Sequence, residues 1–210
     1  ISGLDHPVIL PKNPIYLDAL LSGQEFWGGV VPKIGHHFIQ VVSIEGFPLA
    51  SSPGLINSLA DLPCLYCWST RFIFMDTHEA VGHLEKFSKK WKQKIRSFFD
   101  QVFNSHSSHV DQNAMNMVSD AQAAIAETNS GEVAQGYYTS VVVLMSENRG
   151  DLEAAARQVA KAVNHMGFTA RIETINTIDA YLGSLPGHGV ENVRRPLLNT
   201  LNLADLMPSN

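Results

Sequence analysis

The sequence contains few of the residues that several common chemistries need. Its 210 residues include only two cysteines, Cys64 and Cys67, which are too few for a disulfide scaffold and indicate a reducing compartment. No glycine is followed by a lysine, so the chain lacks the Walker A loop, in which glycine amides and a lysine bind phosphates. The formal net charge is −5, so no overall basic field exists to attract nucleic acid.

Long apolar runs are missing as well. None approaches the roughly 18–20 residues that span a bilayer, and no secretory signal pattern is present. The hydrophobic fraction of 45% is nevertheless sufficient for a packed core, and 210 residues suit one domain with a small appendage. Because the chain starts at Ile1 rather than at methionine, we expect it to be a piece of a longer protein.

Hydrophobic periodicity predicts alternating strands and helices. Apolar–polar alternation, or a continuous apolar run, predicts strands at 38–44, 66–74, 137–145 and 168–173. Apolar residues that repeat at three and four positions, together with capping signals, predict helices at 53–60, 77–103, 114–125, 152–166 and 176–183. A short helix at 13–23 and a hairpin that turns near Pro32–Gly35 are expected before them.

This order of elements predicts an α+β fold. It consists of two split βαβ halves, ferredoxin-like in plan, with an inserted helical hairpin. Right-handed crossovers would place the helices on one face of the sheet. We divide the chain into an N-terminal helix and hairpin arm (1–35), an α+β domain (36–183) and a final segment (184–210). Regular structure in the final segment should be interrupted by two prolines and two glycines: Pro186, Gly187, Gly189 and Pro196.

Several patterns that resemble catalytic motifs have simpler interpretations. Asp76 and Glu147 each follow an apolar strand, as a Walker B acid does, but Asp76 also forms a capping box with Glu79. We interpret Asp76 as a helix cap and Glu147 as a favourable charge at a helix N-terminus. One Cys-x-x-Cys pair offers too few ligands for zinc, and the Ser- and His-containing turn at 104–111 is interpreted as a hairpin tip. We therefore expect no catalytic, cofactor-binding or metal-binding residue.

The strongest charge pattern lies in the stretch from Lys86 to Arg96. It contains six of the fifteen lysines and arginines and no acid: Lys86, Lys89, Lys90, Lys92, Lys94 and Arg96. One interpretation is a solvated helix face whose apolar stripe, Phe87, Trp91 and Ile95, packs on the core. The other is a contact surface for anionic lipid, an acidic partner helix or a nucleic-acid backbone.

A nucleic-acid-binding function is the alternative hypothesis for the whole chain. Trp68, Phe72 and Phe74 share one face of a predicted strand and could stack bases if that face were open. A standalone domain that binds single-stranded nucleic acid would use such a platform. The net charge of −5 and the buried appearance of the strands argue against it.

Five stretches resemble the CagE/TrbE/VirB family of type IV secretion ATPases. They are 6–29, 68–80, 90–104, 129–145 and 182–208, so the resemblance covers essentially the whole chain. The most specific of them is LGSLPGHGVENVRRPLLNTLNLADLMP, which begins at Leu182. In the family, this motif lies at the end of the N-terminal region, shortly before the motor domain with its Walker motifs.

The resemblance implies a non-catalytic part of a larger ATPase. ATP and Mg²⁺ would bind to a C-terminal domain outside this chain, and segment 184–210, with Pro186, Gly187, Arg194 and Arg195, would connect to that domain with its leucines partly exposed. The implied partners are inner-membrane components of the secretion system, the ATPase domain and further copies of the protein. The implied location is the cytoplasmic face of the bacterial inner membrane. Contact with nucleic acid stays open, as does a reach of Arg194 or Arg195 to a neighbouring nucleotide.

Overall fold

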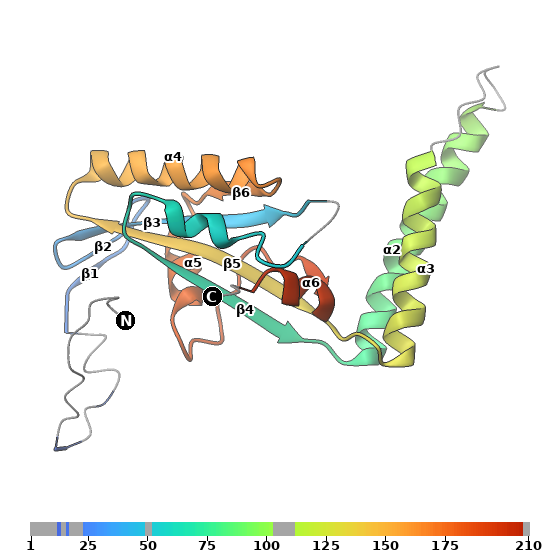
Figure 1. The fold of residues 1–210 in the computed structure, drawn as a ribbon, viewed down its shortest axis with the longest axis horizontal. Helices are drawn as coiled ribbons and strands as arrows, with labels where there is room; N and C mark the ends of the chain where they lie inside the picture. The colour runs from blue at the N-terminus through green and yellow to red at the C-terminus, as the bar shows by residue number, and fades with distance from the viewer. Residues whose placement is uncertain (1–11, 14–15, 17–22, 49–51, 103–111, 208–210) are drawn as a thin grey trace.

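An antiparallel sheet with helices on both faces forms the body of the fold (Figure 1). The computed structural model describes residues 12–13, 16, 23–48, 52–102 and 112–207, without the side chains of 91, 93–102 and 112–115. Four strands form the body of the sheet: β3 (His37–Gly46), β4 (Tyr66–Phe74), β5 (Gln135–Ser146) and β6 (Thr169–Ile172). All four correspond to strands that periodicity predicts.

The order of these strands is β6-β3-β5-β4, and every neighbouring pair is antiparallel. β5 therefore lies between β3 and β4, and β3 lies between β5 and β6, as two split βαβ halves require. The predicted α+β class is confirmed. Three short strands extend the sheet beyond a simple ferredoxin-like plan: β1 (Phe26–Trp27), β2 (Lys33–Ile34) and β7 (Leu197–Asn199).

The helices cover both faces of the sheet, so the expectation of a single covered face was wrong. η1 (Asn57–Asp61), α4 (Arg149–His165) and α6 (Thr200–Asp205) cover one face, and α5 (Thr177–Ser184) covers the other. The larger core contains Val42, Val142, Leu152 and Val159, and the smaller core contains Ile39, Val41, Val143 and Ala180. The physical reason is that β3 and β5 are apolar on both faces, so each face needs a cover.

One local prediction is wrong, and two others lie outside the described residues. The helix predicted at 53–60 is a turn followed by the short 3₁₀ helix η1, because Gly54 has a φ of +75° and cannot continue an α-helix. The hairpin turn falls at Gly35 and His36, at the end of the predicted range. Most of the helix predicted at 13–23 lies outside the described residues, as does the turn predicted at 104–111.

The C-terminal segment is part of the sheet and core, contrary to the irregular structure expected throughout it. β7 pairs with β5 through residues 135–137, and α6 follows directly. Leu206 is only 2% exposed and belongs to the larger core, whereas Leu201 is exposed. Residues 185–196 have no helix or strand, in agreement with their prolines and glycines.

A helical hairpin projects from the sheet where β4 ends and β5 begins (Figure 1). It consists of α2 (Thr77–Val102) and α3 (Gln112–Ser130), and we call it the arm. The Asp76 side chain accepts a hydrogen bond from His78 N–H at 2.8 Å, which confirms its interpretation as the cap of α2. The two helices pack mainly on each other, and α2 approaches the sheet mainly near the start of β5.

Candidate functional site

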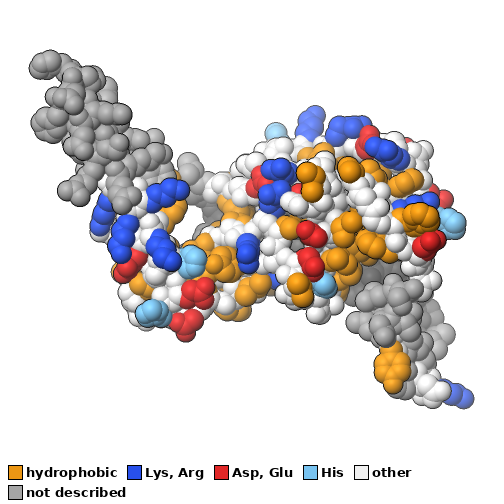
Figure 2. Space-filling model, turned by 180° about the vertical axis from the view of Figure 1, so that it is seen from behind, with side chains coloured by type: hydrophobic (Ala, Val, Ile, Leu, Met, Phe, Trp, Pro, Cys, Tyr) orange, Lys and Arg blue, Asp and Glu red, His pale blue; other side chains and the backbone are white. Residues whose placement is uncertain are grey.

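The arm carries a row of exposed lysines on α2. Lys86, Lys89, Lys90 and Lys92 are all exposed, and Lys89 and Lys90 follow Lys86 by three and four positions, so these three share one side of α2. Figure 2 shows basic side chains gathered on the arm. Lys89 makes an ion pair with Glu85 at 3.5 Å, between two exposed side chains. The side chains of the other two predicted contact residues, Lys94 and Arg96, lie outside the description.

The base of the arm contacts the sheet through an aromatic residue that the sequence patterns did not single out. The Tyr137 hydroxyl lies 3.4 Å from His83 Nε2, and His83 lies 3.8 Å from Glu79 one turn earlier on α2. Arg195 from the terminal segment lies over the Tyr137 ring, with its Cζ 5.6 Å from the ring centroid. Tyr137 therefore contacts both the arm and the terminal segment, which are the two regions proposed from sequence as working surfaces.

Arg71 on β4 holds the first part of the terminal segment in place. Its guanidinium donates to the carbonyl of Gly183 at 2.6 Å, to that of Glu191 at 2.9 Å, and to that of His188. Ser69, two residues earlier, donates from its hydroxyl to the carbonyl of Ser184 at 3.1 Å. The segment is therefore anchored by contacts between residues far apart in the sequence. Local sequence patterns cannot predict such contacts.

The side chains of the two arginines in the segment lie in different environments. Arg194 makes a bidentate pair with Glu173, at 2.9 and 3.2 Å, and a further ion pair with Glu45 at 3.0 Å. Its hydrogen bonds to Glu173 raise the pKa of the Arg194 guanidinium. The Glu173 side chain is only 2% exposed, whereas Arg195 is exposed. Arg194 thus has a structural partner, and Arg195 is the arginine that is accessible from outside.

The remaining candidates do not assemble into a catalytic site in the described part of the chain. Glu147 is exposed in the loop after β5, and the residue that caps α4 is Asn148, whose side chain accepts from Gly150 N–H at 2.8 Å. Cys67 is exposed, Cys64 is half-buried, and burial raises the pKa of the Cys64 thiol. Among the described residues, no three His, Cys, Asp or Glu side chains could hold a metal together.

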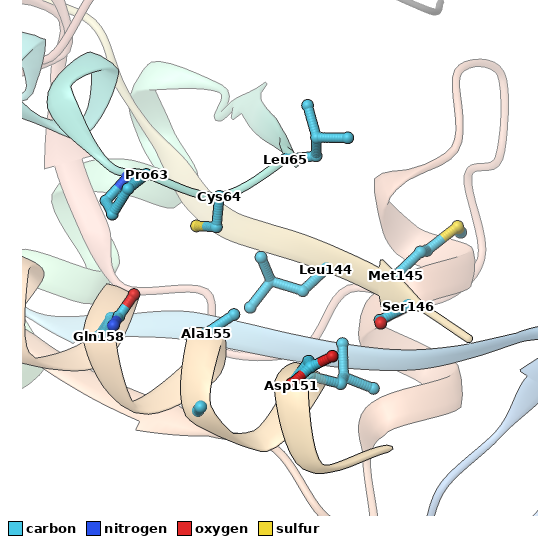
Figure 3. A pocket seen from close by; sticks show the side chains of 11 residues that line it. Pro63, Cys64, Leu65, Leu144, Met145, Ser146, Asp151, Ala155 and Gln158 are labelled. Carbon is cyan, nitrogen blue, oxygen red and sulfur yellow. The ribbon is translucent and has the colours of Figure 1, made fainter. Parts of the chain in front are cut away.

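A cavity of about 350 Å³ lies between the loop that precedes β4, the end of β5 and helix α4 (Figure 3). Leu144, Leu152 and Cys64 line it with apolar and thiol groups, and Asp151 and Gln158 contribute polar groups. Its lining contains no lysine or arginine, so it does not fit the phosphates of a nucleotide.

The aromatic platform required by the nucleic-acid alternative is largely covered. Trp68 and Phe72 are partly buried against the larger core, and Trp68 Nε1–H donates to Ser140 Oγ at 2.7 Å. Of the three aromatic residues, only Phe74 is exposed. This geometry disfavours base stacking on β4.

No helix within the described ranges combines the length and the apolar composition needed to cross a bilayer.

Comparison with known proteins gives a consistent result. A family model described as "CagE, TrbE, VirB family, component of type IV transporter system" matches residues 1–194. The chain is 48% identical over all 210 residues to a probable conjugal transfer protein TrbE of Sinorhizobium fredii (strain NBRC 101917 / NGR234), and covers 32% of it. It is also 48% identical over 210 residues to "Conjugal transfer protein TrbE" of Rhizobium radiobacter, and covers 26% of it.

The chain thus spans about a third and a quarter of the lengths of these two relatives. The matched region of the family model includes strands β1 to β6, the arm, and the terminal segment as far as Arg194. The match agrees with the family resemblance of the five stretches described above. The chain belongs to the CagE/TrbE/VirB family, whose members are components of type IV transporter systems.

Proposed function

We propose that this chain is the non-catalytic N-terminal interaction part of a conjugal transfer ATPase. The observation that carries the proposal is the arm, a helical hairpin that projects from the sheet and presents exposed Lys86, Lys89, Lys90 and Lys92. A projecting basic surface suits contact with acidic proteins or anionic headgroups. The small share of the relatives' lengths that the chain covers supports a further domain elsewhere in the longer protein.

ATP and Mg²⁺ would bind in that further domain and not in this chain. The residues here fit them poorly, since no glycine precedes a lysine and the cavity beside α4 lacks a basic side chain. Asp76, one of the two acids with a Walker B-like position, is engaged in capping α2. We therefore assign no nucleotide chemistry to any residue of this chain.

The arm would dock to inner-membrane components of the transfer system at the cytoplasmic face of the bacterial inner membrane. The terminal segment would face the ATPase domain of the same protein, because its turn at Pro186 and Gly187 is exposed and Arg195 is accessible. Further copies of the protein would assemble through surfaces outside the arm.

The experiment is a pelleting assay with inverted inner-membrane vesicles. Vesicles from cells that express the other components of the transfer system are compared with vesicles from otherwise identical cells that lack them. We expect the chain to pellet with the first set and to stay in the supernatant with the second. Equal pelleting with both sets would indicate general lipid binding, and no pelleting with either would contradict the proposal.

A further inference from the structure

The outer edge of β4 is the longest strand edge without a partner strand in the described part of the chain. The nine residues of β4 pair with β5 in continuous register, from Tyr66 opposite Leu144 to Phe74 opposite Gly136. No described strand pairs with the opposite side of β4. The outer strands at the other side of the sheet, β1, β2 and β6, are only two, two and four residues long.

The hydrogen bonds around β4 establish which backbone groups its outer edge presents. Met75 N–H donates to the carbonyl of Gln135 at 2.9 Å, so residue 75 points its backbone groups toward β5. Tyr138 N–H, opposite Phe72, points away from β4 and donates to the carbonyl of Pro196 at 2.9 Å. Since backbone direction alternates along an antiparallel strand, the even-numbered residues present their N–H and C=O groups at the outer edge: Tyr66, Trp68, Thr70, Phe72 and Phe74.

Natural edge strands usually carry features that prevent pairing with another strand, and β4 lacks the commonest of them. It contains no proline, no lysine and no bulge. Its one charged residue, Arg71, donates to carbonyls of the terminal segment. Exposed apolar side chains lie at both ends of the strand, with Leu65 92% exposed before it and Phe74 67% exposed at its end.

The residue pattern of β4 is symmetric about Thr70. Aromatic residues lie two positions away on each side, Trp68 and Phe72, and four positions away on each side, Tyr66 and Phe74. Between them, apolar Cys67 matches Ile73, and polar Ser69 matches Arg71. A strand whose pattern reads alike in both directions is complementary to an antiparallel copy of itself.

We propose that β4 pairs with β4 of a second copy of this chain, antiparallel, with Thr70 opposite its own counterpart. Such a contact is isologous, so each interaction occurs twice about the two-fold axis. It joins the two sheets into one continuous sheet and satisfies the outer backbone groups of both strands. The proposal does not depend on the docking function of the arm.

The pairing also accounts for the exposed apolar residues. Each Phe74 lies opposite the Tyr66 of the other copy, and each Trp68 lies opposite the other copy's Phe72, as aromatic cross-strand pairs. Leu65 of one copy is brought beside the end of the other β4. No like charges lie directly opposite each other, because Arg71 lies opposite Ser69. These features favour a second copy of the chain over an unrelated strand as the occupant of this edge.

Sedimentation of the full 210-residue chain tests the proposal. We expect a concentration-dependent dimer for the unchanged chain. Thr70→Lys places two ammonium groups side by side on the two-fold axis and should raise the dimer dissociation constant about tenfold or more. The control is Thr174→Lys, which adds the same charge at an exposed residue outside β4 and should leave dimerisation unchanged. A monomer at all concentrations, or equal effects of the two variants, would overturn the pairing.

A cysteine cross-link tests the register in case Thr70→Lys does not fold. In a Cys64→Ala, Cys67→Ser background, Thr70→Cys puts two thiols within reach of a disulfide across the axis. Phe74→Cys is the matched control, because the two copies of that residue lie about 26 Å apart in this register. We expect a covalent dimer from the first variant and at least about tenfold less from the second under mild oxidation. Equal cross-linking of both would contradict the register.

Discussion

At the residue scale, a buried ion pair explains why the terminal segment is folded onto the sheet. Glu173, the residue directly after β6, is almost completely buried, and Arg194 from the terminal segment makes two hydrogen bonds to it. Arg194 adopts a φ of +55°, and it is the only non-glycine residue with positive φ within the described ranges. A bidentate pair of this kind offsets the unfavourable backbone conformation and the desolvation of the carboxylate.

Removal of one partner from this pair should be costly. Arg194→Gln leaves the buried carboxylate of Glu173 without its counter-charge, and we expect the free energy of unfolding to fall by about 3 kcal/mol. Glu173→Gln together with Arg194→Gln should cost clearly less than Arg194→Gln alone, because no charge is then buried. Urea denaturation of the unchanged chain, of Arg194→Gln, of Glu173→Gln and of the double variant measures this. A double variant that loses the sum of the two single losses would show that the pair is not coupled.

The two cysteines should differ in reactivity. Burial raises the pKa of the Cys64 thiol, so less of the reactive thiolate exists at a given pH, while Cys67 is exposed. With iodoacetamide at mildly alkaline pH, we expect Cys67 to be alkylated first, and the rate at Cys64 to keep rising at higher pH. Mass spectrometry of the digested protein measures both rates. Faster labelling of Cys64 would contradict its burial.

At the element scale, a glycine in β5 and a glycine in α2 differ in the space available for a side chain. A Cβ on Gly136 in β5 would lie 2.5 Å from the Phe72 ring and 2.6 Å from the carbonyl oxygen of Ile73. A Cβ on Gly82 in α2 would meet no atom within 4 Å. Strand β5 therefore needs glycine where β4 packs closely on it, whereas helix α2 has room for a larger residue.

Alanine at these two positions should change stability in opposite directions. Gly136→Ala should destabilise the protein by about 1–3 kcal/mol, because the backbone carbonyl of Ile73 cannot move without disturbing the β4–β5 ladder. Gly82→Ala should stabilise helix α2 by about 0.5–1 kcal/mol. Thermal or chemical denaturation provides both values. A neutral Gly136→Ala would indicate that β4 and β5 are packed less closely than described.

Elements with a strong local pattern were predictable from the sequence, and those fixed by distant contacts were not. The local sequence is enough to predict β4 from its alternation, β5 from its apolar run, and the helix cap at Asp76. β7 forms only because β5 is available to pair with it, and residues 183–191 are held by Arg71 more than 100 positions earlier. The predicted helix at 53–60 failed at Gly54, whose positive φ depends on the turn around it.

The same distinction applies to the candidate site. The lysines of α2 were found because charge runs are visible in sequence, and the four whose side chains the structure describes are exposed. The sequence could not separate Arg194 from Arg195, since only folding brings Glu173 beside the first of them. Tyr137 was missed because its strand reads as a continuous apolar run, and its contacts with His83 and Arg195 come from distant segments.

At the scale of the whole molecule, the shape separates a packed body from a projecting arm (Figure 1). The sheet and its two cores hold the terminal segment, whereas the described part of the arm contacts the sheet mainly at its base, through His83 and Tyr137. Charge changes on the outer side of α2 should therefore alter binding without altering the fold. This separation makes the docking function of the arm testable by substitution.

The most direct test is charge reversal on the arm in the vesicle pelleting assay. Lys86→Glu, Lys90→Glu and Lys92→Glu are combined, and Lys89 is kept because a glutamate there would lie beside Glu85. The control is Lys161→Glu, a charge reversal at an exposed position of α4, and Arg157 is kept because a glutamate there would lie beside Glu153. We predict that the arm variant loses at least about tenfold in binding to vesicles that contain the transfer system, because attraction to an acidic partner becomes repulsion, while the control binds as the unchanged chain does. Unchanged binding of the folded arm variant would contradict the account.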